Sequence, residues 1–200
     1  MQLYGSLTSP YTRKVRVVLA EKAIPCEFIV ADATADAGPV PALNPLGKVP
    51  VLMRDDGSTL FDSPVIAEFI DSMAAPALIP PVGDLRWSVR RWEALADGIM
   101  DAVVARLLES RRPVAQQSRE YVARQEGKVA RALAFAAAEL GDGVHLVADQ
   151  FSLADIALAV ALEYTDFRYP HDWRGRHPRL AEWLALTATR PSLSSTQPPR

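Results

Sequence analysis

Two short stretches of this 200-residue chain carry groups whose types and spacing could bind a small polar ligand. In the first, Asp62 and Ser63 stand before Pro64, and serine followed by proline is a typical helix start, with Ser63 as N-cap. The unpaired N–H groups and the dipole of a helix N-terminus attract a carboxylate, and Asp62 could bind an ammonium beside it. We therefore expect this pair to hold the α-amino acid end of a ligand.

The second stretch is Val49-Pro50, where the residue before the proline is restricted to an extended conformation. Extended backbone at this position could pair with a peptide-like ligand by strand addition. The preceding Lys48 could bind a ligand carboxylate, or it could equally be solvated. An ordinary hairpin leading into a helix is the alternative interpretation of both stretches.

The elements that must position these groups follow from turn signals and hydrophobic spacing. Short strands are expected at residues 2–5, 26–30, 51–53 and 59–61, with helices after Ser9-Pro10 and Ser63-Pro64. Because a helix separates the first two strands, those strands should pair in parallel. Residues 31–43 are expected to form a loop or a short irregular helix.

The second half of the chain shows only helical patterns. Helices are predicted at residues 87–108, 117–140, from Ser152 onward and at 178–186, and Asp155 should form a capping box with Ser152. Prolines and a glycine mark a linker. We therefore predict an α/β domain at residues 1–75, a linker at 76–85 and an all-α domain at 86–200.

The run Asn44-Pro45-Leu46-Gly47-Lys48-Val49-Pro50-Val51-Leu52, followed by Phe61-Asp62-Ser63, closely resembles the glutathione-binding region of cytosolic glutathione S-transferases. The resemblance implies a thioredoxin-like N-terminal domain, an all-α C-terminal domain and a homodimer. It also implies that Pro50 is cis, that the Val49 backbone pairs with the cysteinyl part of glutathione, and that Asp62-Ser63 hold its γ-glutamyl end.

The turn Ser9-Pro10-Tyr11-Thr12 resembles the active-site turn of serine-type glutathione transferases, which implies that Ser9 Oγ donates a hydrogen bond to the glutathione sulfur. A cysteinyl thiol with a pKa near ~8.5 is about 3% ionised at pH ~7, and lowering that pKa by about two requires about 2.7 kcal/mol. One hydrogen bond to a charged group supplies about 1.5–3 kcal/mol. Ser9 could instead be a plain N-cap, with Tyr11 or Thr12 contacting the sulfur.

The same resemblance implies that the thiolate attacks a small electrophile held against the helical domain. The residues expected to line that apolar pocket are Tyr11, Met100, Val104 and Leu108. Asp97 and Asp101, one helical turn apart, could act across a dimer interface or could be solvated. The electrophile itself stays unnamed, because residues 31–43 and the helical domain build its pocket.

Two other functions are compatible with these motifs. One is a glutathione-binding or regulatory protein with little turnover. The other is a different glutathione-dependent reaction, such as peroxide reduction, dehalogenation or isomerisation.

Composition argues against several partners. The net charge is −2 and no apolar run approaches the length of a membrane span, so we expect neither a nucleic acid nor a membrane partner. Cys26 is the single cysteine, which excludes an internal disulfide and fits a reducing cytosol. The N-terminus lacks the basic region of a signal peptide, so a cytoplasmic protein is expected. The histidines show no metal-ligand spacing, and no metal is expected.

Overall fold

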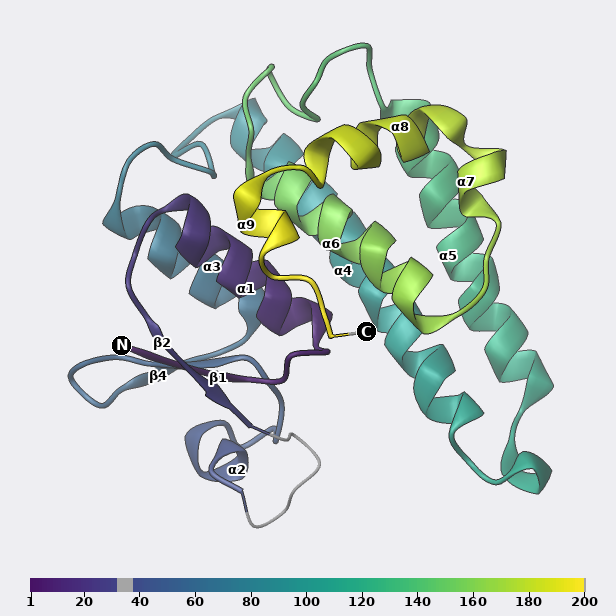
Figure 1. The fold of residues 1–200 in the computed structure, drawn as a ribbon, viewed down its shortest axis with the longest axis horizontal. Coiled ribbons are helices and arrows are strands. Elements are labelled where there is room, and N and C mark those ends of the chain that lie inside the picture. Colours follow the sequence, from purple (N-terminus) through teal and green to yellow (C-terminus); the bar gives the residue numbers. More distant parts are fainter. Residues whose placement is uncertain (32–37, 200) are drawn as a thin grey trace. The chain divides into compact units, whose positions relative to one another are not determined.

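The computed structural model describes residues 1–31 and 38–199 (Figure 1). It divides into two compact units, one formed by Met1–Pro81 with the residues from Arg190 onward and the other by Val82–Thr189. The boundary falls inside the predicted linker at 76–85. The last residues, however, belong to the first unit and not to the predicted helical domain at 86–200.

Within its described residues the first unit has a four-stranded sheet in the order β2-β1-β3-β4. The strands are β1 (Gln2–Gly5), β2 (Glu27–Val30), β3 (Val51–Met53) and β4 (Thr59–Leu60). β1 pairs with β2 in parallel, as the strand–helix–strand order predicted, and β3 is antiparallel to both β1 and β4. The start of β3 therefore lies beside the C-terminal ends of β1 and β4.

Helices α1 (Pro10–Glu21) and α3 (Ser63–Met73) pack against each other and supply much of the core of the first unit (Figure 1). Their fully buried apolar side chains are Val15, Val17, Val18, Ile66, Ala67 and Ile70. A short helix, α2 (Val40–Leu43), lies in the predicted loop at 31–43 and contacts β3. Residues 32–37 of that loop lie outside the described residues.

The C-terminal tail joins the first unit because its polar groups find partners on α1. The short helix α9 (Pro191–Ser194) packs against α1, and the Arg190 guanidinium donates to the Glu21 carboxylate at 2.8 and 3.1 Å. Arg13 is buried and donates to the Leu193 carbonyl at 3.1 Å. Sequence reasoning missed these contacts, since nothing in a proline- and serine-rich tail indicates its docking surface.

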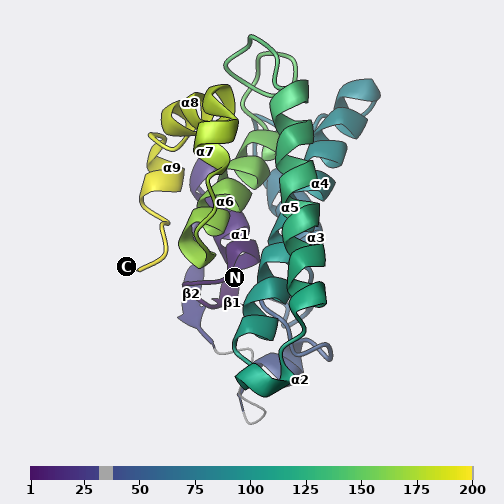
Figure 2. The ribbon, with the colours of Figure 1, turned by 90° about the vertical axis from the view of Figure 1, so that its right-hand side faces the viewer.

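The regular secondary structure of the second unit is helical (Figure 2), apart from an isolated β-bridge between Val147 and Gln150. Its elements are α4 (Asp84–Ser110), a 3-10 turn (Val114–Gln116), α5 (Arg119–Glu139), α6 (Leu153–Arg168), α7 (Trp173–Arg176) and α8 (Pro178–Thr187). Helix α6 is buried on nearly every side, with α4 packed along it. The predicted capping box is present, as the Ser152 N–H donates to the Asp155 carboxylate at 2.9 Å. No helix in the described ranges has the length and apolar character needed to span a bilayer.

His171, between α6 and α7, should make the stability of the second unit depend on pH. Its Nδ1 is buried without a hydrogen-bond partner in the described chain, and burial together with the Arg176 charge lowers the His171 pKa below its usual 6.5. The unfolded chain then binds the proton more tightly, so the free energy of unfolding falls as the pH drops through the unfolded pKa toward the folded one.

Replacing His171 by glutamine should flatten that slope when thermal unfolding is followed between about pH 5 and 7.5. Arg176→Gln should flatten it partly, because it removes only the second cause. Identical pH profiles for the original chain and His171→Gln would contradict this assignment.

Candidate functional site

The segments that carry the predicted ligand-binding residues meet at one edge of the sheet in the first unit. Because β3 is antiparallel to both neighbours, β1 ends, β3 begins and β4 ends at the same edge. The chain leaving β1 leads to Ser9, the chain entering β3 holds Val49-Pro50, and the chain leaving β4 leads to Asp62-Ser63. Three stretches that are far apart in the sequence are thus brought to one side of one small domain.

The backbone of Val49 is available for pairing with an extended ligand. The Val49–Pro50 peptide bond is cis, as the resemblance implied. Within residues 1–31 and 38–199, neither the N–H nor the C=O of Val49 has a hydrogen-bond partner. The turn before it is fixed, since Asn44 Nδ2 donates to the Lys48 carbonyl at 2.9 Å while the Lys48 side chain is exposed.

Asp62 is the N-cap of α3 and Ser63 is the first helical residue, so the helix begins one position earlier than predicted. The Asp62 carboxylate is exposed and forms neither a cap hydrogen bond nor an ion pair within the described part of the chain. Ser63 is buried, and the N–H groups of Ser63 and Val65 have no partner in that same part. An exposed carboxylate beside unpaired N–H groups suits an ammonium and a carboxylate carried by one ligand.

Ser9 can serve both as a helix cap and as a hydrogen-bond donor to a ligand. As the N-cap of α1, its Oγ accepts a hydrogen bond from the Thr12 N–H at 3.2 Å. A hydroxyl also has one hydrogen to donate, and no acceptor for it lies among the residues described here. The two roles weighed for Ser9 from the sequence therefore use different parts of the same group.

Thr12 is poorly placed to contact a ligand sulfur. Its side chain is fully buried and packs tightly against Gly5. A Cβ added to Gly5 would lie only 2.3 Å from Thr12 Cγ2. Tyr11, the other alternative, is half-buried on the first turn of α1. Thr12 Oγ1 is buried without a hydrogen-bond partner among the described residues, and which of Ser9, Tyr11 and Thr12 contacts the sulfur stays a prediction.

The residues expected to line the electrophile pocket are divided between the two units. Tyr11 lies in the first unit, whereas Met100, Val104 and Leu108 lie on α4 at a spacing of one turn. Met100 is buried, Val104 is half-buried and Leu108 is 56% exposed. Their sharing of one pocket stays a prediction.

Two further expectations concern charged side chains. The predicted action of Asp97 or Asp101, both on α4, across a dimer interface also stays a prediction. Over the described ranges, no group of three or more His, Cys, Asp or Glu side chains is arranged to hold a metal ion.

Comparison with known proteins identifies the family. The sequence profile of "Glutathione S-transferase, N-terminal domain" matches residues 3–77, and that of "Glutathione S-transferase, C-terminal domain" matches residues 119–186. The chain therefore belongs to the glutathione S-transferase family.

Individual relatives are similar over the whole length. The chain is 45% identical to an uncharacterized GST-like protein, YibF, of Escherichia coli, with 100% of both chains covered. A glutathione S-transferase of Methylobacillus flagellatus, solved with glutathione bound, has a TM-score of 0.96 and 42% identity over 99% of each chain. One of Methylobacterium radiotolerans, in complex with glutathione sulfonate, has a TM-score of 0.94 and 39% identity, covering 100% of this chain and 95% of that one. The predicted fold, thioredoxin-like α/β followed by all-α, is confirmed.

Proposed function

We propose that this protein is a serine-type glutathione transferase, which activates the thiol of bound glutathione for attack on a small electrophile. The observation that carries the proposal is the convergence, at one sheet edge, of three groups that have no partner among the described residues. These are the Val49 backbone, the Asp62 carboxylate beside the α3 N-terminus, and the Ser9 hydroxyl hydrogen at the α1 N-terminus. Relatives solved with glutathione or its sulfonate support the choice of ligand.

Each part of glutathione has a complementary group in this arrangement. The γ-glutamyl ammonium would bind the Asp62 carboxylate, and its carboxylate the N–H groups at the start of α3. The cysteinyl backbone would pair with Val49 beside Pro50. Lys48, exposed next to Val49, would bind the remaining carboxylate.

The Ser9 hydroxyl would then donate a hydrogen bond to the sulfur and favour thiolate over thiol. The bond from the Thr12 N–H to Ser9 Oγ polarises that hydroxyl and makes it a better donor. A second contribution of about 0.3–1 kcal/mol comes from the positive end of the α1 dipole. The thiolate electron pair forms the new carbon–sulfur bond, and the displaced group leaves with the electrons of its own bond.

A direct test of the glutathione site uses Asp62. Replacing it by asparagine removes the charge that binds the ammonium and should weaken glutathione binding about tenfold or more. Calorimetric titration with reduced glutathione measures the dissociation constant. Asp56→Asn, at another exposed aspartate of the same unit, is the matched control and should leave it unchanged. Absence of both binding heat and thermal protection at millimolar glutathione would refute the proposal.

Measurements of turnover distinguish this proposal from the two alternative functions. A binding or regulatory protein would bind glutathione and show no conjugation with any acceptor. A panel that includes peroxides, haloalkanes and isomerisable substrates distinguishes transfer from the other glutathione-dependent reactions. The proposal extends to a cytosolic homodimer, as family membership suggests, and sedimentation velocity tests the oligomeric state.

A further inference from the structure

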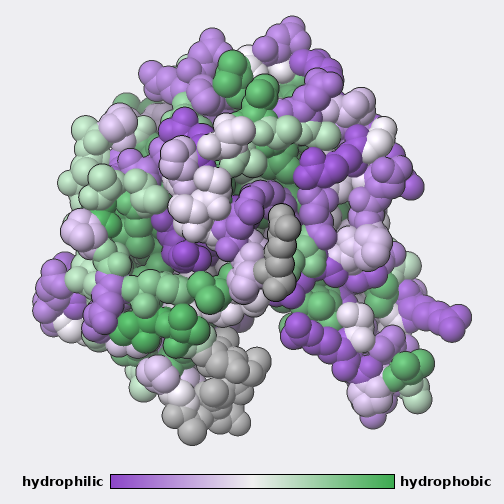
Figure 3. Space-filling view, viewed as in Figure 1, coloured by the Kyte–Doolittle hydropathy of each residue, from purple (hydrophilic) through white to green (hydrophobic). Residues whose placement is uncertain are grey.

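A cavity opens in the first unit, away from the proposed glutathione site. It has a volume of about 600 Å³ and is lined by Leu3, Arg16, Leu19, Ala20, Ala23, Ile24, Pro25, Cys26, Phe28, Ser195 and Thr196. Cys26 directly precedes β2, so this end of the cavity lies at the start of the parallel strands. The proposed glutathione site lies beyond the end of β1, at the opposite edge. Figure 3 shows hydrophobic surface over the region of β2 on the face drawn there.

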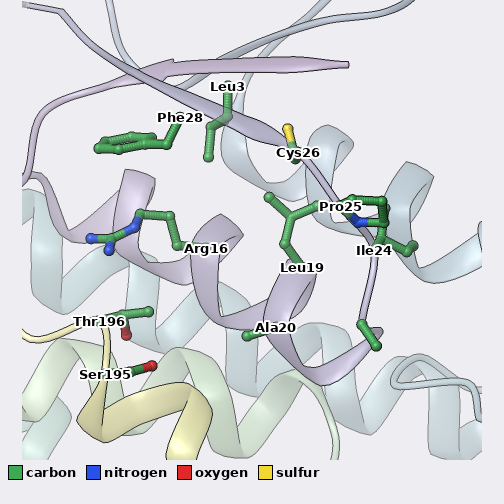
Figure 4. Close-up of a pocket in the computed structure, with 11 residues that line it drawn as sticks. Leu3, Arg16, Leu19, Ala20, Ile24, Pro25, Cys26, Phe28, Ser195 and Thr196 are labelled. Carbon is green, nitrogen blue, oxygen red and sulfur yellow. The ribbon is translucent and has the colours of Figure 1, made fainter.

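The lining is polar at one end and apolar at the other (Figure 4). Arg16 and Ser195 lie at the polar end, where the Ser195 hydroxyl makes no hydrogen bond within the described residues. Leu19, Ile24 and Pro25 form the apolar end, beside the Cys26 thiol. A ligand that fills the cavity should therefore have a polar head and an apolar body.

The positive charge of Arg16 determines which charge the polar head of the ligand should carry. Its guanidinium lies 4.9 Å from the centroid of the Phe28 ring and forms no ion pair in the described chain. Half-burial, together with the nearby charge of Arg13, lowers the Arg16 pKa, and no carboxylate of the described residues opposes this shift. A partly desolvated cation without a counter-charge favours an anion.

The Cys26 thiol carries no negative charge that would repel an anionic ligand. Burial raises the pKa of its thiol, which keeps the group protonated and neutral near pH 7. It is also the single cysteine of the chain, so a maleimide that reacts with cysteine modifies only this lining residue, whose thiol lies 3.6 Å from the Met1 carbonyl oxygen.

We propose that this cavity binds a monocarboxylate with an apolar chain, in the manner of a medium-chain fatty acid. The carboxylate would bind the Arg16 guanidinium and the Ser195 hydroxyl, and the chain would lie against Leu19, Ile24 and Pro25. Glutathione, which is polar along its whole length, does not match the apolar end.

Octanoate is the probe for this site. Added to the full-length protein, it should bind with measurable heat and slow the reaction of Cys26 with a maleimide in a saturable manner. The alcohol 1-octanol, which has the same chain without the charge, should protect about tenfold less well. Arg16→Gln should weaken octanoate binding by about tenfold or more, whereas Arg119→Gln, at an exposed arginine of α5, should not.

A second variant keeps the test valid if the Arg16→Gln protein does not fold. Ala20→Phe adds volume to an exposed position of α1 that lines the cavity, and should block octanoate without removing any charge. Retained glutathione binding and circular dichroism check the fold of both variants. Saturable protection that survives unchanged in Arg16→Gln, or no protection by octanoate at millimolar concentration, would overturn the proposal.

Discussion

Replacing Ser9 by alanine is expected to lower kcat/KM for conjugation at pH ~7 about 25-fold while glutathione still binds. The reason is that the Ser9 hydroxyl hydrogen, which no described residue uses, would bond more strongly to a thiolate than to a thiol. Without it, the pKa of bound glutathione should return toward ~8.5, and the rate at pH ~7 should fall with the thiolate fraction. The ultraviolet absorbance of the thiolate, titrated against pH on the complex, measures that pKa directly.

The N-cap role of Ser9 must be separated from its role toward the sulfur. Replacing an N-cap serine by alanine costs about 0.5–2 kcal/mol of stability, whereas replacing it by glycine costs only a few tenths of a kcal/mol. Ser9→Gly should therefore be nearly as stable as the original chain and as slow as Ser9→Ala. Ser6→Ala removes a hydroxyl from the same loop, one that contacts Thr8 Oγ1 at 3.1 Å, and should retain activity.

The Tyr11 hydroxyl is the alternative hydrogen-bond donor to the glutathione sulfur. If Tyr11→Phe, and not Ser9→Ala, raises the pKa of bound glutathione, then the tyrosine is the donor and the serine-type assignment is wrong. If neither variant changes a measurable rate because the original chain has none, the protein binds glutathione without turning it over. Both results would leave the family assignment and the glutathione site intact.

The backbone features of the proposed site could be predicted from the sequence because they are local. Val49-Pro50 and Ser63-Pro64 restrict the backbone through their own covalent geometry, so the extended segment and the helix start could be predicted from neighbouring residues. The error of one position at the start of α3 has the same origin, since Asp62 and Ser63 are both good N-cap residues.

What the sequence did not predict depends on long-range contacts. Nothing near Arg13 or Glu21 indicates that each binds a segment about 170–180 residues away. The Arg16–Phe28 cavity combines residues from α1, β2 and the C-terminal tail, so no contiguous motif marks it. Such contacts carry no local signal, because hydrophobic periodicity reports which face is buried and not what covers it.

The largest effect on stability is expected at Asp71, in the last turn of α3. Its carboxylate accepts hydrogen bonds from the N–H groups of Leu78 and Ile79 at 2.7 and 3.0 Å, and from Lys22 Nζ at 2.7 Å. The side chains of Asp71 and Lys22 are 7% and 1% exposed. Lys22 also donates to the carbonyls of Ala74 and Pro76, so this pair joins the ends of α1 and α3 to the segment that follows.

Replacing Asp71 by asparagine should lower the free energy of unfolding by about 3–5 kcal/mol, because it leaves the buried Lys22 charge without a counter-charge. Asp142→Asn, at a fully exposed aspartate paired with Arg179, is the matched control and should change it by no more than about 0.5 kcal/mol. Urea unfolding measures both variants.

The double variant Lys22→Met with Asp71→Leu tests whether the cost comes from the uncompensated charge. Removing both charges should cost less than the sum of the two single changes, by about 0.5–3 kcal/mol. Strict additivity would instead attribute the loss to the hydrogen bonds with Leu78 and Ile79. Because glutathione would bind only the folded chain, saturating glutathione should raise the free energy of unfolding of Asp71→Asn and so recover part of the lost stability. No gain in stability at saturating glutathione would mean that the folded variant does not bind the ligand.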